Sequence, residues 1–216
     1  MLPAVLIYLG ILFRLPVEMT LLIHLVVELL IPTLIVRAFS DSELFRVQWK
    51  INRFEGSAVM GILLGIFFCG LVVFLYWLID KVFGWDLEDN LLRTPLPQNR
   101  ILEIIAAFYL VVIVPYIEEW YWRRYNYYMF YRNEINYWIT SILWSTAYLV
   151  VAYMTELELR GMIFMAACFI IFGRIQIVIM GTYEAFGAYM THMGASFGIM
   201  LCYFLEKNNR LGDPYK

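Results

Sequence analysis

Long apolar stretches separated by short polar segments run through the chain, and their lengths predict membrane-spanning helices. A spanning helix needs about 20 mostly apolar residues. Residues 57–79, 136–155 and 185–205 reach that length without an aspartate, glutamate, lysine or arginine. This pattern predicts an all-α, polytopic membrane protein.

Three further apolar stretches contain polar side chains. They are residues 161–183 with Arg174 and Gln176, residues 101–117 with Glu103, and residues 15–36 with Glu18, His24 and Glu28. Because an ionisable side chain is costly in lipid, we expect these groups to face neighbouring helices or the membrane interface. The chain is therefore predicted to contain six spans. Residues 2–13 are too short to cross alone and are a candidate for a seventh membrane segment.

The polar connections say little about orientation or function. Residues 37–56 and 80–100 are the two main connections, and the second, with two prolines and mixed charge, is predicted to be an ordered surface loop. Lysine and arginine are balanced between the two expected sides, so orientation is not indicated. The N-terminus lacks a basic start, which favours a retained segment over a cleaved signal. No internal repeat is present.

Composition agrees with a membrane protein and excludes several other classes. Of 216 residues, 62% are hydrophobic and 16% are charged, whereas soluble domains carry about 25% charged residues. The net charge of −2 gives no reason to expect a nucleic-acid partner. Three cysteines without a CxxC spacing and two histidines give no disulfide framework or zinc site, so we expect no metal and no cofactor. Membrane lipids are the expected surroundings, and which membrane is not indicated.

The stretch "YIEEWYWRRYNYYMFYR", residues 116–132, places two adjacent glutamates at the end of an apolar segment. On a helix, Glu119 and Arg123 are i,i+4 neighbours in the order that favours an ion pair. Glu118 then points about 100° away and is free to face elsewhere. Two interpretations stay open. The stretch is either a functional site, since intramembrane ionisable residues are often functional, or a solvated helix end within an aromatic belt at the membrane interface.

The stretch "YMTHMGASFGIM" places His192 and Ser196 on one face of an apolar helix. Gly194 and Gly198 form a GxxxG pattern that favours close helix packing. A lone histidine on an apolar helix is most often a satisfied core residue, so this motif alone does not establish chemistry.

Two further features are ambiguous by themselves. Trp144 and Tyr148 are i,i+4 neighbours, which taken alone indicates core packing. Arg174 lies near the middle of a span, where we expect it to find a carboxylate or carbonyl partner. Glu103, Glu118 and Glu119 are the candidate carboxylates.

Taken in order, these motifs resemble the CPBP family, which comprises the type II CAAX prenyl endopeptidases, the Abi proteins and bacteriocin-processing or immunity relatives. The family pattern is EExxxR, then FxxxH, then HxxxN or a small variant. The segments "ITSILWSTAYLV" and "FGRIQIVIMGTYEAFGAYMTHMGASFGIML" fall where the family has its second motif and last two helices. The resemblance covers about residues 100–206. It implies N-terminal helices and loops in residues 1–99, a CPBP-like core in residues 100–206 and a polar tail in residues 207–216.

The resemblance also implies roles for individual residues. Glu118 matches the carboxylate that activates water, Glu119 its supporting neighbour, and Arg123 the arginine that holds the helix end. His192 matches the third-motif histidine, and Ser196 stands where the family usually has asparagine. Both of these groups help to stabilise the oxyanion in the family. The glutamates are then expected to face a cavity shared with His192.

The second motif departs from the family. Its histidine, the partner of the glutamate on the water, falls at Tyr148, with Trp144 as the aromatic residue. A phenol titrates near pH 10 in isolation and does not share a proton near neutral pH as imidazole does. General acid–base assistance is worth about 10² to 10⁴-fold in rate, so its loss predicts a silent site.

Two hypotheses follow. One is an active glutamate-dependent intramembrane endopeptidase acting on a membrane-associated or prenylated peptide. The other, which the missing histidine favours, is a CPBP-fold protein without catalysis that serves as a subunit, immunity factor or assembly factor of a membrane complex. A small transporter or channel is a third class, but no inverted repeat or pair of broken helices supports it.

Overall fold

The described part of the chain consists of helices. The structure, a computed structural model, describes residues 19, 22–23, 25–31, 33–34, 54–82, 84, 96–97, 99–125, 134–154 and 157–212. Within these ranges the regular elements are all helical. They include the short π-helix η1 (Val26–Leu30), helix α5 (Phe54–Trp77) with its π-helical end η2 (Leu78–Val82), helix α10 (Glu134–Met154) and helix α11 (Leu159–Gly212).

Four consecutive elements form the segment that carries the two glutamates. They are α7 (Arg100–Phe108), η3 (Tyr109–Ile113), α8 (Val114–Glu118) and η4 (Glu119–Tyr125). Asn99 starts the segment, because its side-chain oxygen accepts hydrogen bonds from the backbone N–H groups of Ile101 and Leu102 at 2.9 and 3.4 Å. Pro115 has no N–H group, and the wider π turn of η3 immediately before α8 accommodates its ring without ending the helix. The segment therefore continues until Glu118 and Glu119 lie at the α8–η4 junction.

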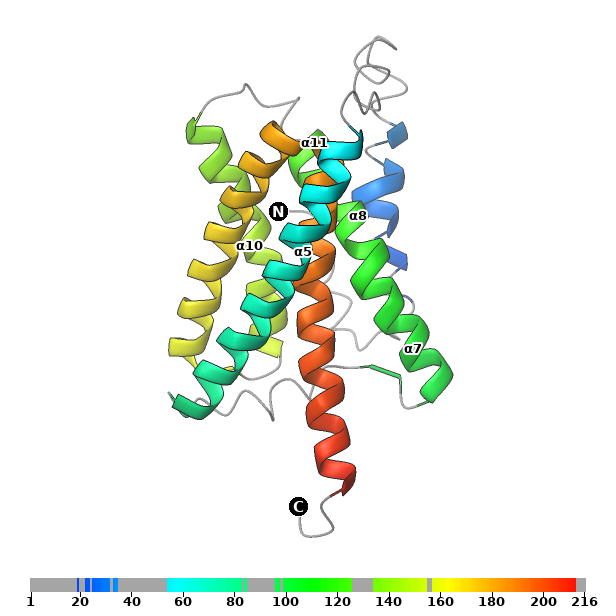
Figure 1. The fold of residues 1–216 in the computed structure, drawn as a ribbon, viewed down its shortest axis with the longest axis vertical. Coiled ribbons are helices and arrows are strands. Elements are labelled where there is room, and N and C mark those ends of the chain that lie inside the picture. Colours follow the sequence, from blue (N-terminus) through cyan, green and yellow to red (C-terminus); the bar gives the residue numbers. More distant parts are fainter. Residues whose placement is uncertain are drawn as a thin grey trace.

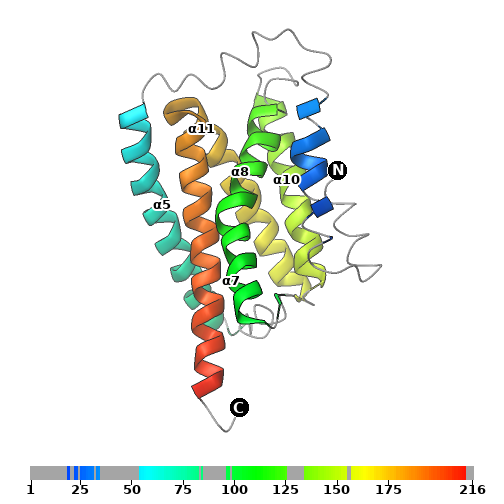
Figure 2. The same ribbon diagram turned by 90° about the vertical axis from the view of Figure 1, so that its right-hand side faces the viewer.

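Helix α11 is broken once. Tyr183 (φ −119°, ψ 19°) and Glu184 (φ 61°, ψ −178°) leave the helical region of the backbone. Figures 1 and 2 show that the chain reverses there, so that the half before the break and the half after it run in opposite directions. The spans predicted for residues 161–183 and 185–205 therefore form a helical hairpin, and the break falls where the sequence pattern separates them.

Glycines set the contact between α5 and the second half of α11. A Cβ atom added at Gly194 would lie 2.1 Å from the carbonyl oxygen of Gly65, and one added at Gly65 would lie 2.7 Å from the carbonyl oxygen of Met190. A Cβ at Gly198 would lie 2.9 Å from the carbonyl oxygen of Cys69. The GxxxG pattern at Gly194 and Gly198 thus does produce close helix packing, and the partner is α5.

The first half of α11 packs on α10 in a similar way. A Cβ at Gly173 would lie 3.1 Å from the indole ring of Trp144 and 3.2 Å from the Cβ of Ser141. The segment from α7 to η4 lies against the second half of α11 on the side away from α5 (Figures 1 and 2). Ala107 of α7 packs there with Met200 and Tyr203 in an apolar cluster. The second half of α11 is therefore the central helix of the described bundle.

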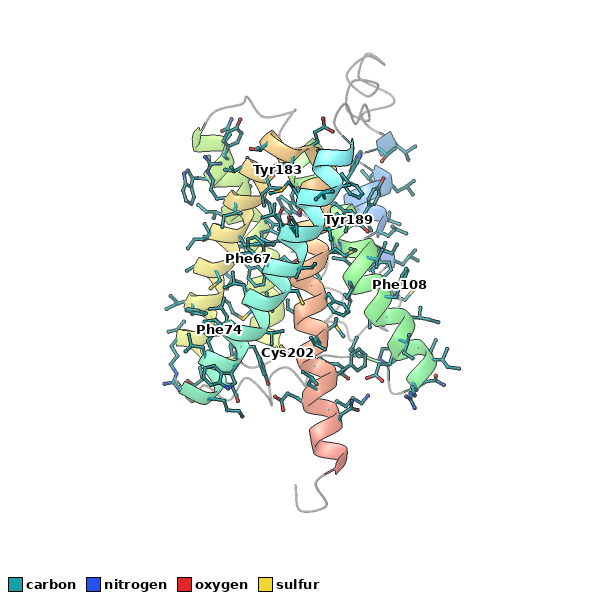
Figure 3. The ribbon with its side chains drawn as sticks, viewed as in Figure 1. Phe67, Phe74, Phe108, Tyr183, Tyr189 and Cys202 are labelled. Carbon is teal, nitrogen blue, oxygen red and sulfur yellow. The ribbon has the colours of Figure 1, made fainter. Side chains whose placement is uncertain are left out.

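Three helices in the described part of the chain are long and apolar enough to cross a membrane: Gly56–Lys81, Arg100–Trp122 and Leu159–Asn208. Their outer faces carry exposed apolar side chains such as Phe67, Phe74 and Phe108, which lie on the outside of the bundle in Figure 3. An outer surface of this kind suits lipid, and the chain is a membrane-embedded helical protein. Helix α10 coincides with the stretch predicted at residues 136–155. Residues 2–13 and His24 lie outside the described residues, as do residues 37–53 and part of residues 15–36.

The break in α11 leads to a stability prediction for Glu184. Its backbone lies in a region that only glycine adopts without strain, and such strain costs about 1–3 kcal/mol. Its buried Oε2 atom makes no hydrogen bond within the described part of the protein. Replacing Glu184 with glycine should therefore raise the free energy of unfolding by about 1 kcal/mol and the melting temperature by about 2–4 °C in thermal unfolding in detergent.

Thr182→Gly is the matched control, since Thr182 is exposed in the last helical turn before the break. Glycine there should lower the free energy of unfolding by about 0.5–1 kcal/mol. Thr182 has helical backbone angles, so the freedom of glycine to adopt positive φ brings no benefit at this position. A lower melting temperature for Glu184→Gly would contradict the assignment of strain to this residue.

Candidate functional site

The carboxylate of Glu118 is the centre of a buried polar cluster. Its Oε2 atom accepts a hydrogen bond of 2.7 Å from the indole N–H of Trp144 and one of 2.6 Å from the hydroxyl of Tyr148. Trp144 and Tyr148 are one turn apart on α10, so both reach the α8–η4 junction from the same helix face. Hydrogen bonds to a charged acceptor are stronger than neutral ones and are worth about 1.5–3 kcal/mol each. The pair therefore fixes α10 against α8.

His192, from the second half of α11, lies between the two glutamates. Its Nδ1 atom is 2.8 Å from Oε1 of Glu119, and its Nε2 atom is 3.6 Å from Oε2 of Glu118. An imidazole protonated on Nδ1 donates a hydrogen bond to an ionised Glu119 carboxylate at this distance. Helix geometry alone left Glu118 free to face away from Glu119, whereas the family resemblance implied that both face a cavity shared with His192. In the structure both carboxylates lie near the imidazole ring, each closest to a different ring nitrogen.

Aromatic rings enclose the cluster. The ring of Trp144 lies edge-on to those of Phe169 and His192, with centroids 5.6 Å apart in both pairs. Tyr148 stacks on Phe169 at 4.2 Å, and Phe172 lies edge-on to His192 at 5.8 Å. Trp144 is 1% exposed, and the exposed fractions of Glu118, Glu119 and His192 are 5% or less. The surroundings are therefore largely shielded from solvent, which strengthens each of these polar contacts.

Two donors from α10 share one oxygen of the Glu118 carboxylate. Each carboxylate oxygen has about two acceptor positions. On Oε2 of Glu118 those positions point to Trp144 and Tyr148, which donate to it directly. The Tyr148 hydroxyl thus fills one acceptor position of this oxygen. The chemistry that the geometry supports directly is hydrogen bonding between α8, α10 and α11.

Two of the predicted site residues, Ser196 and Arg123, are not part of the hydrogen bonds described above. Ser196 lies one helical turn beyond His192 on α11 and is half-buried, and no hydrogen bond links it to the glutamates or to His192 among the described residues. The side chain of Arg123 lies outside the described residues, so its ion pair with Glu119 stays a prediction.

Arg174 contacts aromatic rings of α10. Its guanidinium lies 5.3 Å from the ring centroid of Tyr137 and 5.8 Å from that of Trp138, both at the start of α10. Glu103, one of its candidate partners, instead accepts a hydrogen bond of 2.9 Å from the hydroxyl of Tyr203 and pairs with Lys207. A guanidinium is attracted to the faces of aromatic rings, which sequence spacing within one span does not reveal, and the expected carboxylate or carbonyl partner of Arg174 stays a prediction.

Two residues of the cluster were not recognised as such from the sequence. Trp144 was interpreted as core packing, although a buried indole N–H usually finds an acceptor. Gln176, which is completely buried, was noted only as a polar residue within a span. With its amide oriented to satisfy both partners, its nitrogen donates to the Ala188 carbonyl oxygen at 3.1 Å and its oxygen accepts from the His192 backbone N–H at 3.2 Å. A polar side chain in an apolar span was the available signal.

No group of three or more histidine, cysteine, aspartate or glutamate side chains in the described part of the chain is arranged so that it could hold a metal ion. The three cysteines are free thiols, and Cys202 is buried. The cluster is therefore described by its hydrogen bonds and ring contacts alone.

Comparison with known proteins adds no family assignment to this geometry. No protein-family model matches the chain, and neither a curated protein nor a solved structure matches it.

Proposed function

We propose that this chain is an integral membrane protein with a CPBP-like core whose glutamate site has lost catalysis, and that it acts as a subunit, or as an assembly or interaction factor, of a membrane complex. The observation that carries the proposal is the 2.6 Å hydrogen bond from the Tyr148 hydroxyl to Oε2 of Glu118. A phenol at this place satisfies the carboxylate but supplies no imidazole to share the proton of a water molecule.

The enclosure of the site supports the same proposal. Glu118 is bound by donors from α10, and Glu119 is bound to His192 of α11. A buried polar network that links three helices favours one way of packing them. A cluster with that role needs no substrate, which suits a protein whose function is to hold a defined shape within a larger membrane assembly.

A multi-pass arrangement of six to seven spans is part of the proposal. The broken helix Leu159–Asn208 contains 50 residues, or about 75 Å of helix, which is more than twice the bilayer's hydrocarbon thickness. We therefore assign it two crossings. Helices Gly56–Lys81 and Arg100–Trp122, helix α10 and residues 15–36 supply the other four, and residues 2–13 the seventh.

The second candidate function is a glutamate-dependent intramembrane endopeptidase of the CAAX prenyl protease type. The observation that favours it is that Glu118 and His192, which match two of the family's reacting groups, lie within 3.6 Å of each other in a membrane-embedded bundle. In that case Glu118 activates water and His192 stabilises the oxyanion, with a membrane-associated or prenylated peptide as substrate.

A comparison of wild type with Glu118→Gln separates the two candidates. For a protein without catalysis, both should leave a prenylated CAAX-type peptide in mixed micelles uncleaved at the same background level. Wild-type cleavage that Glu118→Gln lowers by about 10²-fold or more would instead establish the endopeptidase. The Tyr148→His variant completes the experiment, because cleavage gained only in the presence of Glu118 reveals a silenced protease site. The absence of a gain leaves the packing role ahead.

Co-purification tests the proposed role in a complex. After extraction from native membranes in mild detergent, the tagged chain should elute with a stable partner protein in a fixed ratio. Disrupting the cluster with Glu118→Leu should reduce recovery of that partner, while Glu158→Gln, at an exposed residue paired with Arg160, should not. A monodisperse preparation of the wild type without any partner would argue against the proposal.

A further inference from the structure

Gln176 lies opposite His192 in the hairpin of α11, and both ends of its amide are bonded to the backbone there. The residue is 0% exposed. An amide buried without partners in an apolar environment costs several kcal/mol, about 4–8 in the transfer to a solvent that forms no hydrogen bonds. In this hairpin the amide nitrogen donates to the carbonyl of Ala188, and the amide oxygen accepts from the N–H of His192. The buried amide is therefore satisfied across the hairpin.

The two backbone groups that Gln176 contacts belong to one turn of helix. Ala188 and His192 are i and i+4, so they are also the acceptor and donor of one rung of the helical hydrogen-bond ladder. A single side chain that forms hydrogen bonds with both of these backbone groups is sensitive to rotation and to translation of that helix. This resembles the effect of a single buried amide in a coiled coil, which fixes the register of the two helices.

The same helix face also contacts the imidazole ring. Phe172, one turn before Gln176, lies edge-on to the ring of His192 with centroids 5.8 Å apart. The first half of α11 therefore holds His192 at two points, by its ring and by its backbone. A slip of one residue in the second half would rotate His192 by about 100° and remove Nδ1 from Glu119.

We infer that Gln176 is a positioning residue, which sets the register of the α11 hairpin so that the His192 ring lies between Glu119 and Glu118. This role deepens the proposed function, because it concerns the same cluster, but it does not depend on whether that cluster is catalytic. It acts through His192 and requires no contact with a substrate.

The environment of His192 can be measured directly, because the chain has two histidines. Protein labelled with ¹⁵N-histidine in detergent micelles gives signals for both rings, and a His192→Gln variant assigns them. In wild type the Nδ1–H proton of His192, bonded to Glu119 and shielded from water, should give a slowly exchanging signal. Gln176→Met, which keeps the length of the side chain but removes both hydrogen bonds, should abolish that signal.

Thr191→Val is the matched control. Thr191 is equally buried and adjacent to His192, and its hydroxyl donates within its own helix to the Gly187 carbonyl at 2.8 Å, its one side-chain hydrogen bond among the described residues. It should keep the Nδ1–H signal. The inference is overturned if a folded Gln176→Met protein retains the signal, or if Thr191→Val loses it equally. Should Gln176→Met not fold, Gln176→Asn, one methylene too short to reach both groups, must show the loss in its place. Because the measurement uses the purified chain alone, a missing partner or substrate does not affect it.

Discussion

Replacing Gly194 with alanine is expected to lower the free energy of unfolding by about 3 kcal/mol or more, the upper end of the range for overpacked sites. The added Cβ atom would lie 2.1 Å from the carbonyl oxygen of Gly65 and 2.5 Å from its Cα. Both obstacles are backbone atoms, so no side-chain rotation relieves the clash. Helices α5 and α11 must move apart, and close contacts such as the one between Gly198 and Cys69 are then lost along the interface.

Thermal unfolding in detergent measures the effect, which corresponds to a fall in melting temperature of about 6–12 °C. Gly70→Ala is the control, because a Cβ at Gly70, on α5, meets nothing within 4 Å. Alanine there should be neutral or stabilising by up to about 1 kcal/mol, since it is the better helix former. Similar melting temperatures for Gly194→Ala and wild type would contradict the close helix approach.

The sequence pattern predicted the parts of the fold that depend on one helix at a time. The apolar lengths located α5 and α10, and the boundary between residues 161–183 and 185–205 coincides with the break at Tyr183 and Glu184. The GxxxG spacing predicted close packing but not its partner, α5, since spacing describes one surface and the contact needs two. Four of the described elements, η1, η2, η3 and η4, are π-helical, which apolar periodicity does not reveal.

In the candidate site, too, the sequence predicted features of single helices but not the contacts between helices. Motif order suggested that Glu118 and His192 share a site, and the structure places them 3.6 Å apart. The atoms that meet there depend on the relative rotation of α8, α10 and α11, which a single sequence does not specify. The donor role of Trp144 and the pairing of Gln176 with Ala188 were missed for that reason. Arg174 lies over the aromatic rings that α10 presents, a contact that spacing within its own span does not predict.

Replacing Glu118 with leucine is the second large effect, with an expected loss of about 3–5 kcal/mol of unfolding free energy. Leucine is similar in size but accepts no hydrogen bond, so the donors of Trp144 and Tyr148 lose their acceptor in a dry environment. Each buried donor left without an acceptor costs about 1–3 kcal/mol. Glu118→Gln keeps an amide oxygen as acceptor and should lose less, so thermal or denaturant unfolding should rank wild type above Glu118→Gln, and Glu118→Gln above Glu118→Leu.

A double-mutant cycle measures how much the hydrogen bond between Tyr148 and Glu118 contributes to stability. Tyr148 stands where the family resemblance implies a histidine. Tyr148→Phe alone removes one donor and should cost about 1.5–3 kcal/mol, whereas in the Glu118→Leu background the hydroxyl has already lost its acceptor and its removal should cost nothing. The control cycle pairs Tyr148→Phe with Glu103→Leu. Glu103 is bonded to Tyr203 and Lys207 and has no bond to this cluster among the described residues, so those two changes should add. Additivity within about 0.5 kcal/mol in the Glu118 cycle as well would show that the Tyr148 bond contributes nothing to stability. The packing role proposed for Glu118 would then rest on its bond to Trp144 alone.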